Sequence, residues 1–105
     1  MRQLIAANWK MHGDLSWDSK PQQLAQLLSK DTHERAIVLI CPPLSMLPAL
    51  VMARADASVS LGAQNCHSEV SGAYTGDVSA QMVAELGASH VILGHSERRA
   101  MSGET

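Results

Sequence analysis

Aromatic side chains are scarce in this sequence, which has two Trp, one Tyr and no Phe among its 105 residues. Any hydrophobic core must therefore be built from Leu, Ile, Val, Met and Ala, as expected of stacked βα units. An excess of basic charge is also lacking, because the formal net charge is −2, and this argues against nucleic-acid binding. Apolar runs such as Ala36–Cys41 are too short to cross a bilayer, and the N-terminus lacks the apolar stretch of a signal peptide. We therefore expect a cytoplasmic protein without a nucleic-acid or membrane partner.

The pattern of a metal site is missing as well. Cys41 and Cys66 form no CxxC motif, and we expect two buried, reduced thiols. The histidines other than His95 show no His-x-x-x-His spacing and are expected at the surface or at strand ends; they are His12, His33, His67 and His90. We therefore expect no metal.

Short apolar runs alternate with helical patterns along the chain. The expected strands are Gln3–Ala7, Ala36–Cys41, Ser58–Gly62 and His90–Leu93. The expected helices are Pro21–Lys30, Leu44–Ala55 and Ser79–Leu86. The strands are almost continuously apolar, as buried parallel strands are. The order β-α-β-α-β-α-β predicts one α/β domain with a parallel sheet and right-handed crossovers.

Polar residues follow the carboxyl end of each expected strand. The segments are Asn8-Trp9-Lys10, Cys41-Pro42-Pro43, Ala63-Gln64-Asn65 and Gly94-His95-Ser96-Glu97. The βα loops at this rim of a parallel sheet hold the active sites of barrels and of open α/β folds. We therefore expect a site at the rim, although the pattern alone specifies no reaction.

Two residues of the rim are the main candidates for binding and catalysis. Lys10 can hold a phosphate as a point charge, although its spacing alone favours a solvated lysine. His95 precedes an expected helical turn, where the helix dipole disfavours imidazolium and a neutral ring can donate a hydrogen bond to a carbonyl. A strand-end histidine that bonds to the backbone is an equal alternative. By itself, Glu97 beside Arg98 and Arg99 indicates a solvated charge cluster.

A long excursion bounded by glycines runs from Gly72 to Asp77. The polar stretch after Asn65 exceeds the usual βα loop of about 2–6 residues. Tyr74 near its tip suggests insertion into a partner subunit, and a mobile surface loop is the alternative.

On the strength of five segments taken together, the chain resembles the triosephosphate isomerases over its whole length. The segments are Ala7-Asn8-Trp9-Lys10-Met11, Cys41-Pro42-Pro43, Gly62-Ala63-Gln64-Asn65, Gly72-Ala73-Tyr74-Thr75-Gly76 and Gly94-His95-Ser96-Glu97-Arg98-Arg99. Each alone is a weak signal, but their order and spacing at expected strand ends are specific. The resemblance implies a (β/α)₈ TIM barrel. Residues 1–105 would be the N-terminal part of that single domain, with its first four strands and three helices.

The resemblance also implies an activity. The family interconverts dihydroxyacetone phosphate and glyceraldehyde 3-phosphate through an enediolate, in glycolysis and gluconeogenesis, without a cofactor and usually as a homodimer. Lys10 would bind the substrate and stabilise enediolate charge, with Asn8 orienting it, and His95 would polarise the carbonyl. Glu97 would support Lys10, and Ser96 would support the turn of His95. The dimer-interface residues would be Gln64, Asn65, Tyr74 and Thr75.

One departure from the family limits this expectation. A barrel of this kind needs about 250 residues, whereas this sequence reaches Thr105. The resemblance places the glutamate base, the closing lid and two phosphate loops beyond that point, so we expect the chain alone to be inactive. The alternatives are a non-catalytic α/β fragment that binds a small anion and a different sugar-phosphate barrel enzyme. The motifs of Lys10 and His95 argue against the latter.

Overall fold

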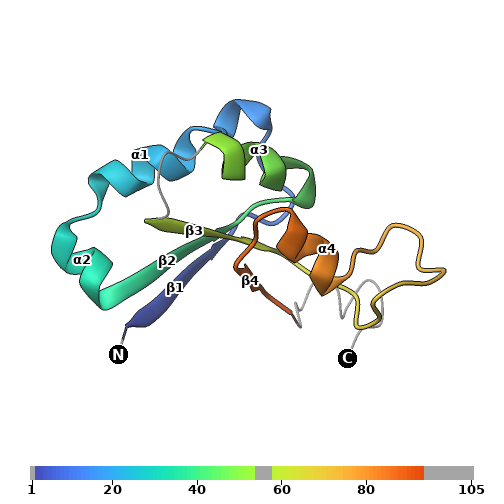
Figure 1. The fold of residues 1–105 in the computed structure, drawn as a ribbon. Helices are drawn as coiled ribbons and strands as arrows, with labels where there is room; N and C mark the ends of the chain where they lie inside the picture. Colours follow the sequence, from blue (N-terminus) through green and yellow to red (C-terminus); the bar gives the residue numbers. More distant parts are fainter. Residues whose placement is uncertain (1, 54–57, 94–105) are drawn as a thin grey trace.

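A parallel sheet of four strands runs through the computed structural model, which describes residues 2–53 and 58–93. The strands are β1 (Gln3–Asn8), β2 (Ala36–Cys41), β3 (Val59–Ala63) and β4 (His90–Val91). They lie side by side in chain order, and each neighbouring pair is parallel (Figure 1). The expected strands are confirmed, with ends that differ by no more than two residues.

The helices follow the strands as the alternating pattern predicts. They are α1 (Lys20–Leu27), α2 (Lys30–Arg35), α3 (Leu47–Ala53) and α4 (Ala80–Glu85), with 3₁₀ turns η1 (Leu15–Trp17) and η2 (Leu44–Met46). The predicted start of α4 is confirmed, because the Ser79 hydroxyl accepts a hydrogen bond of 3.2 Å from the Met82 amide. Pro48 lies in the first turn of α3, where a proline is tolerated.

The region between β1 and β2 differs from the prediction of one helix, so the described residues hold four α-helices where three were expected. The chain is extended at Leu28, and Ser29 then caps a second helix by accepting a hydrogen bond from the Thr32 amide. The helix predicted over 21–30 is confirmed as α1, although it ends at Leu27, and α2 was missed. Its sequence carries no apolar stripe and buries no residue, so periodicity gave no signal for it.

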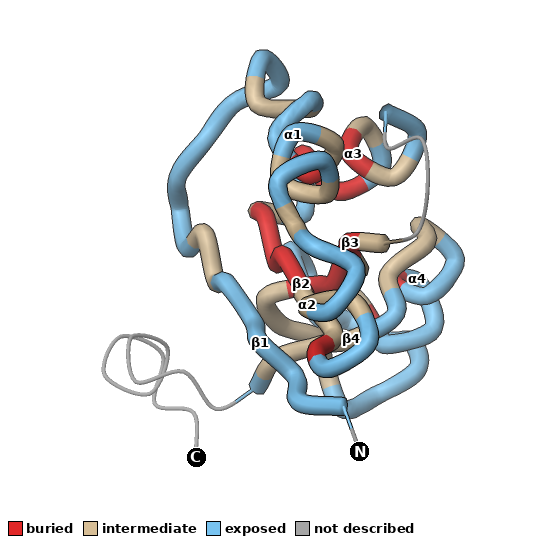
Figure 2. Tube along the Cα trace, turned by 90° about the vertical axis from the view of Figure 1, so that its left-hand side faces the viewer, coloured by how far each residue is buried: buried red, intermediate tan, exposed pale blue. Residues whose placement is uncertain are grey.

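The core lies between the sheet and the helices that cover one of its faces (Figures 1 and 2). The buried cluster comprises Ile40, Met46, Leu47, Leu50, Val59, Leu61, Ala63 and Val83. Alternate residues of β3 point into this cluster, as the period of a strand requires. The aliphatic core expected from the composition is confirmed, with Trp9 and Trp17 packed against its margin. Among the described residues, no helix has the length and apolar character needed to cross a membrane.

Gly62 lets β3 and β4 approach each other closely. A Cβ atom at this position would lie 2.6 Å from the carbonyl oxygen of His90 and 3.1 Å from the sulfur of Cys41. The first of these contacts is with backbone, which cannot move aside without separating the strands. Glycine at this position therefore allows β4 to pair with β3 in the observed register.

β1 is an exposed strand at one end of the sheet. Leu4 and Ile5 are 53% and 52% exposed, although they occupy the middle of the strand (Figure 2). Neighbouring residues of a strand point to opposite faces, so both faces of β1 present apolar surface. Within the described ranges, no strand pairs with its outer edge. Such an edge invites pairing with another chain.

We expect the 105-residue chain to self-associate at micromolar concentration through β1. Replacing Leu4 with Lys should shift sedimentation towards the monomer, because a charge on an edge strand opposes pairing. The matched control is Leu27→Lys in α1, where the leucine is 83% exposed and lies away from the edge. A sharp monomer peak for the unmodified chain would contradict this expectation.

Candidate functional site

The carboxyl ends of β1, β2 and β3 lie next to one another at one rim of the sheet. Asn8 pairs with Cys41 in the parallel register, and Gln64 follows the last residue of β3. The structure therefore brings together the polar residues that the sequence placed after the first three strands. The rim forms because parallel strands in register end on the same side.

Lys10 has an unusual backbone conformation at this rim. Its φ is 53°, which makes it the one non-glycine residue in the left-handed region among the described residues. Such a conformation costs about 1–2 kcal/mol for a residue with a Cβ atom. Two contacts hold it: the Lys10 amide donates to Asn8 Oδ1 at 2.8 Å, and the Lys10 carbonyl accepts from Gln64 Nε2 at 2.8 Å. Strain maintained in this way is typical of functional positions.

The carboxamide of Gln64 joins three strand ends. Besides its bond to Lys10, Nε2 donates to the carbonyl oxygen of Cys41 at 2.9 Å, and that oxygen also accepts from the Trp9 amide at 3.0 Å. The sequence placed Gln64 on the rim as an interface residue, but no sequence signal pointed to this bridge within the chain. Its partners lie 54 and 23 residues away, so only the fold brings them together.

Residues on both sides of Lys10 pack against the core. The rings of Trp9 and Trp17 meet edge to face with centroids 5.4 Å apart, and the Lys20 ammonium lies 5.1 Å from the Trp17 ring. Asp14 caps η1, and its hydrogen bonds from the Ser16 hydroxyl and amide lower the pKa of its carboxyl group. These contacts fix both ends of the loop that carries Lys10.

The predicted interface residues lie on the segment after β3. Asn65 is half-buried, whereas Thr75 is exposed and Tyr74 is 44% exposed. The Tyr74 ring stacks on His67, with centroids 3.9 Å apart and an angle of 27° between the planes. His67 was expected to be a plain surface or strand-end residue, and the sequence gave no indication of this contact.

His95, Ser96 and Glu97 lie outside the described residues. The described part of the chain reaches Leu93, two residues before His95. The roles expected for these three residues remain predictions.

The two cysteines have different surroundings. Both are free, but Cys41 is fully buried whereas Cys66 is only half-buried, so the expectation of two buried thiols is wrong for Cys66. Burial raises the pKa of the Cys41 thiol. Over residues 2–53 and 58–93, no three His, Cys, Asp or Glu side chains are grouped as metal ligands would be.

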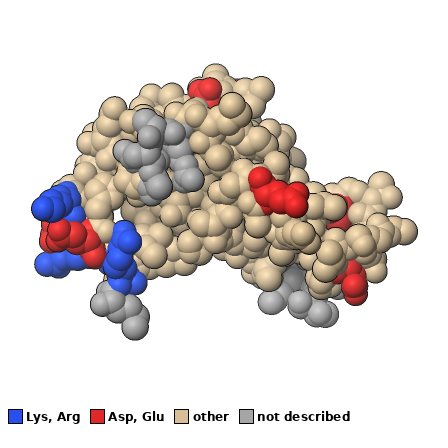
Figure 3. Space-filling model, viewed as in Figure 1, with Lys and Arg blue, Asp and Glu red and all other residues tan. Residues whose placement is uncertain are grey.

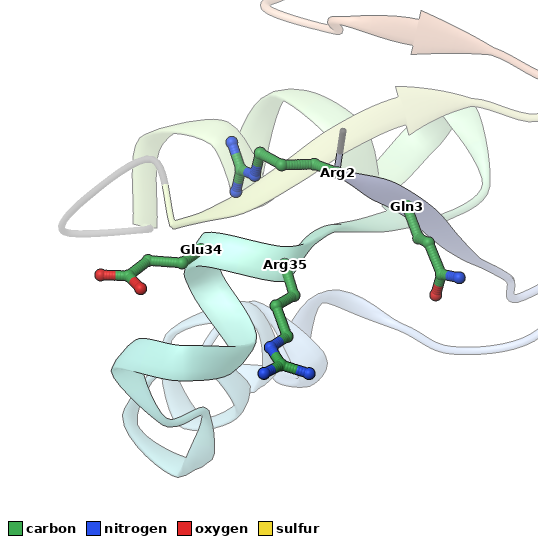
Figure 4. Close-up of a pocket in the computed structure, with 4 residues that line it drawn as sticks. All are labelled: Arg2, Gln3, Glu34 and Arg35. Atoms are coloured by element: carbon green, nitrogen blue, oxygen red, sulfur yellow. The ribbon is translucent and has the colours of Figure 1, made fainter.

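A second polar region lies at the opposite end of the sheet, where charged side chains gather near α2 (Figure 3). An open hollow there is lined by Arg2, Gln3, Glu34 and Arg35, whose side chains point apart (Figure 4). Arg2 donates to the carbonyl oxygens of His33 and Ala36 at 2.6 and 2.9 Å, and so caps the carboxyl end of α2. Arg35 pairs with Asp31 at 3.1 Å. These arginines therefore serve the helix, and the rim remains the better site.

Comparison with known proteins decides the family. The family model for triosephosphate isomerase matches residues 3–105. This chain belongs to the triosephosphate isomerase family. The half-barrel sheet and the rim that carries Lys10 are therefore the first part of a TIM barrel, as the resemblance implied.

Individual relatives agree over the whole chain. The triosephosphate isomerase of Herpetosiphon aurantiacus is 48% identical over 99% of this chain, and that of a Bradyrhizobium species is 45% identical over 100%. The crystal structure of triosephosphate isomerase from Bartonella henselae superposes with a TM-score of 0.84 at 39% identity, covering 100% of this chain. The chain spans 41% and 42% of the two curated relatives and 43% of the crystallised chain.

The strain at Lys10 can be measured by comparing two variants of this isomerase-family chain. Lys10→Gly should have a higher free energy of unfolding than Lys10→Ala, by about 0.5–1 kcal/mol. Relief of about 1–2 kcal/mol of left-handed strain exceeds the entropic cost of a glycine, about 0.5–1 kcal/mol. Urea unfolding at one protein concentration measures the difference. A glycine variant less stable than the alanine variant would show that the conformation is unstrained.

Burial should protect one thiol from alkylation. We expect iodoacetamide to modify Cys66 faster than Cys41 in the folded chain, because Cys41 is inaccessible and burial raises the pKa of its thiol above the ordinary value. Peptide mass spectrometry measures the two rates. In concentrated urea the rates should become equal, and equal rates without urea would contradict the buried position of Cys41.

Proposed function

We propose that this chain supplies the substrate-binding and electrophilic part of a triosephosphate isomerase site. The reaction interconverts dihydroxyacetone phosphate and D-glyceraldehyde 3-phosphate through an enediolate. The observation that carries the proposal is the strained backbone of Lys10, which hydrogen bonds from two strand ends hold at the rim. A strained lysine at the carboxyl end of a barrel strand is better explained by catalysis than by stability.

Lys10 provides a positive charge where the reaction develops a negative one. Its ammonium group would bind the anionic substrate and stabilise the enediolate, an effect that is strongest when the charge is already in place. The Asn8 side chain accepts a hydrogen bond from the Lys10 amide, and this bond orients Lys10. Because the left-handed backbone is held on both sides, the lysine has little freedom to leave the rim.

His95 would act as a neutral electrophile that donates a hydrogen bond to the substrate carbonyl, the established role of the histidine in well-studied enzymes of this family. Glu97 would support Lys10, and Ser96 would support the turn of His95. The proton next to the carbonyl must leave to a base, and the matching residue of the family lies outside these 105 residues. No cofactor is needed for this proton transfer.

We further infer the setting in which the chain works. Residues 1–105 would form the N-terminal part of one barrel domain in a cytoplasmic enzyme of glycolysis and gluconeogenesis. Tyr74 and Thr75 would enter a homodimer interface, supported by the exposure of this segment, with Gln64 and Asn65 at its base. No contact among residues 2–53 and 58–93 favours the non-catalytic anion-binding alternative.

The test compares the chain alone with a joined barrel, in which residues 1–105 are fused to the part of the Bartonella henselae isomerase that follows its matched segment. The chain alone should show no turnover, because a missing base costs about 10²–10⁴-fold. The joined barrel should isomerise triose phosphates. Lys10→Met in the joined barrel should lower kcat/KM by at least about 100-fold, since it removes transition-state charge stabilisation.

The matched control is Lys30→Met, which removes an exposed lysine on α2 at the far end of the sheet. It should leave kcat/KM within about twofold, as expected of a surface substitution. Circular dichroism should show that both variants are folded. A folded Lys10→Met barrel that kept its kcat/KM would contradict the proposal.

A further inference from the structure

The segment between β3 and α4 is closed on itself at its base. The His67 amide donates to the Val78 carbonyl at 2.7 Å, and His67 forms an isolated parallel bridge with Ser79, the cap of α4. Figure 1 shows the segment extending away from the sheet as a long loop. Its two ends therefore stay together while its tip lies far from the core.

His67 also binds the tip through its side chain. Its Nδ1 accepts a hydrogen bond from the Glu69 amide at 3.0 Å, which fixes the plane of the imidazole ring. The Tyr74 ring stacks on that plane at 3.9 Å. A Cβ atom on Gly72 would lie 2.6 Å from Cε2 of Tyr74, so the ring also occupies the space left by a glycine with φ 144°. The ring of Tyr74 thus packs in one position, formed by His67 and Gly72 together, which we call its seat.

The position of Tyr74 determines that of its neighbours. The Asp77 amide donates to the Tyr74 carbonyl at 2.9 Å, which closes a turn over residues 74–77. Thr75 and Gly76 form the exposed tip of this turn. A displaced Tyr74 ring would therefore displace Thr75.

We propose that His67 is a positioning residue that presents Thr75 to a second copy of this chain. The imidazole does not touch the partner in this proposal; it keeps Tyr74 seated so that the tip is ordered before the subunits meet. This rests on the proposed function, because that function places the tip in a homodimer. Preorganisation of this kind strengthens association by lowering the ordering cost at the interface.

Chymotrypsin tests the seat of Tyr74 on the full 105-residue chain, which has one Tyr and no Phe. Cleavage after Tyr74 produces the pieces 1–74 and 75–105, which mass spectrometry distinguishes from cleavage at the tryptophans. His67→Ala should raise the rate of this cleavage about threefold to tenfold, as the loss of one aromatic stack predicts. The control is His12→Ala, which replaces an exposed histidine and should not change the rate.

Two further variants separate the ring from its hydrogen bond. His67→Phe keeps a ring under Tyr74 and should restore slow release of the piece 75–105. The new phenylalanine is itself a cleavage site, so cleavage after residue 67 is counted separately. His67→Asn keeps an acceptor for the Glu69 amide without a ring and should remain fast. Equal rates for His67→Ala and the control, or rescue by Asn instead of Phe, would overturn the proposal.

The joined barrel tests the presentation of Thr75 independently of the chymotrypsin assay. There, His67→Ala should raise the subunit dissociation constant measured by sedimentation about threefold to tenfold, with kcat unchanged at high protein concentration, and His67→Phe should reverse the effect. An unchanged dissociation constant would overturn the presentation role. If the unmodified joined barrel dimerises but has no activity, the proposed function fails, and the dissociation constants of the His67 variants still decide the role of His67.

Discussion

The rim depends on one side-chain amide. The carboxamide of Gln64, which follows β3, donates to the carbonyl oxygen of Cys41, the last residue of β2, and to that of Lys10, two residues beyond β1. Strand pairing alone would bring these ends near one another, but it would not hold a lysine in the left-handed region. The bridge is polar and lies at the rim, so it fixes the backbone of Lys10 at a position where no packing of the apolar core could do so.

Stability and chemistry are separated along the strands. The buried cluster packs residues within β2 and β3, as far as Ile40 and Ala63 near their carboxyl ends, against the helices, whereas Lys10 lies exposed beyond the end of β1. The same separation is seen in TIM barrels generally, in which the carboxyl ends of strands carry catalysis. A core built from aliphatic residues can therefore tolerate a strained residue at the rim, because hydrogen bonds at the rim itself hold the strained backbone.

The loop after β3 shows the same principle on a smaller scale. Its tip is far from the core, yet His67 and Gly72 give the Tyr74 ring a defined seat. The stacked ring therefore holds a loop that is exposed to solvent.

Most of the fold follows from local sequence patterns. Apolar runs determined the strands, the Ser79 cap determined the start of α4, and the alternation of strands and helices determined a parallel sheet. The motifs around Lys10 and Gln64 also placed candidate residues at the rim and indicated the family. Only the tertiary structure decided the left-handed backbone of Lys10, the Gln64 bridge and the stack of Tyr74 on His67. Periodicity and capping report the apolar face and the ends of single elements, whereas these features depend on polar and aromatic contacts that the folded chain brings together, such as those of Gln64 with residues 54 and 23 positions away.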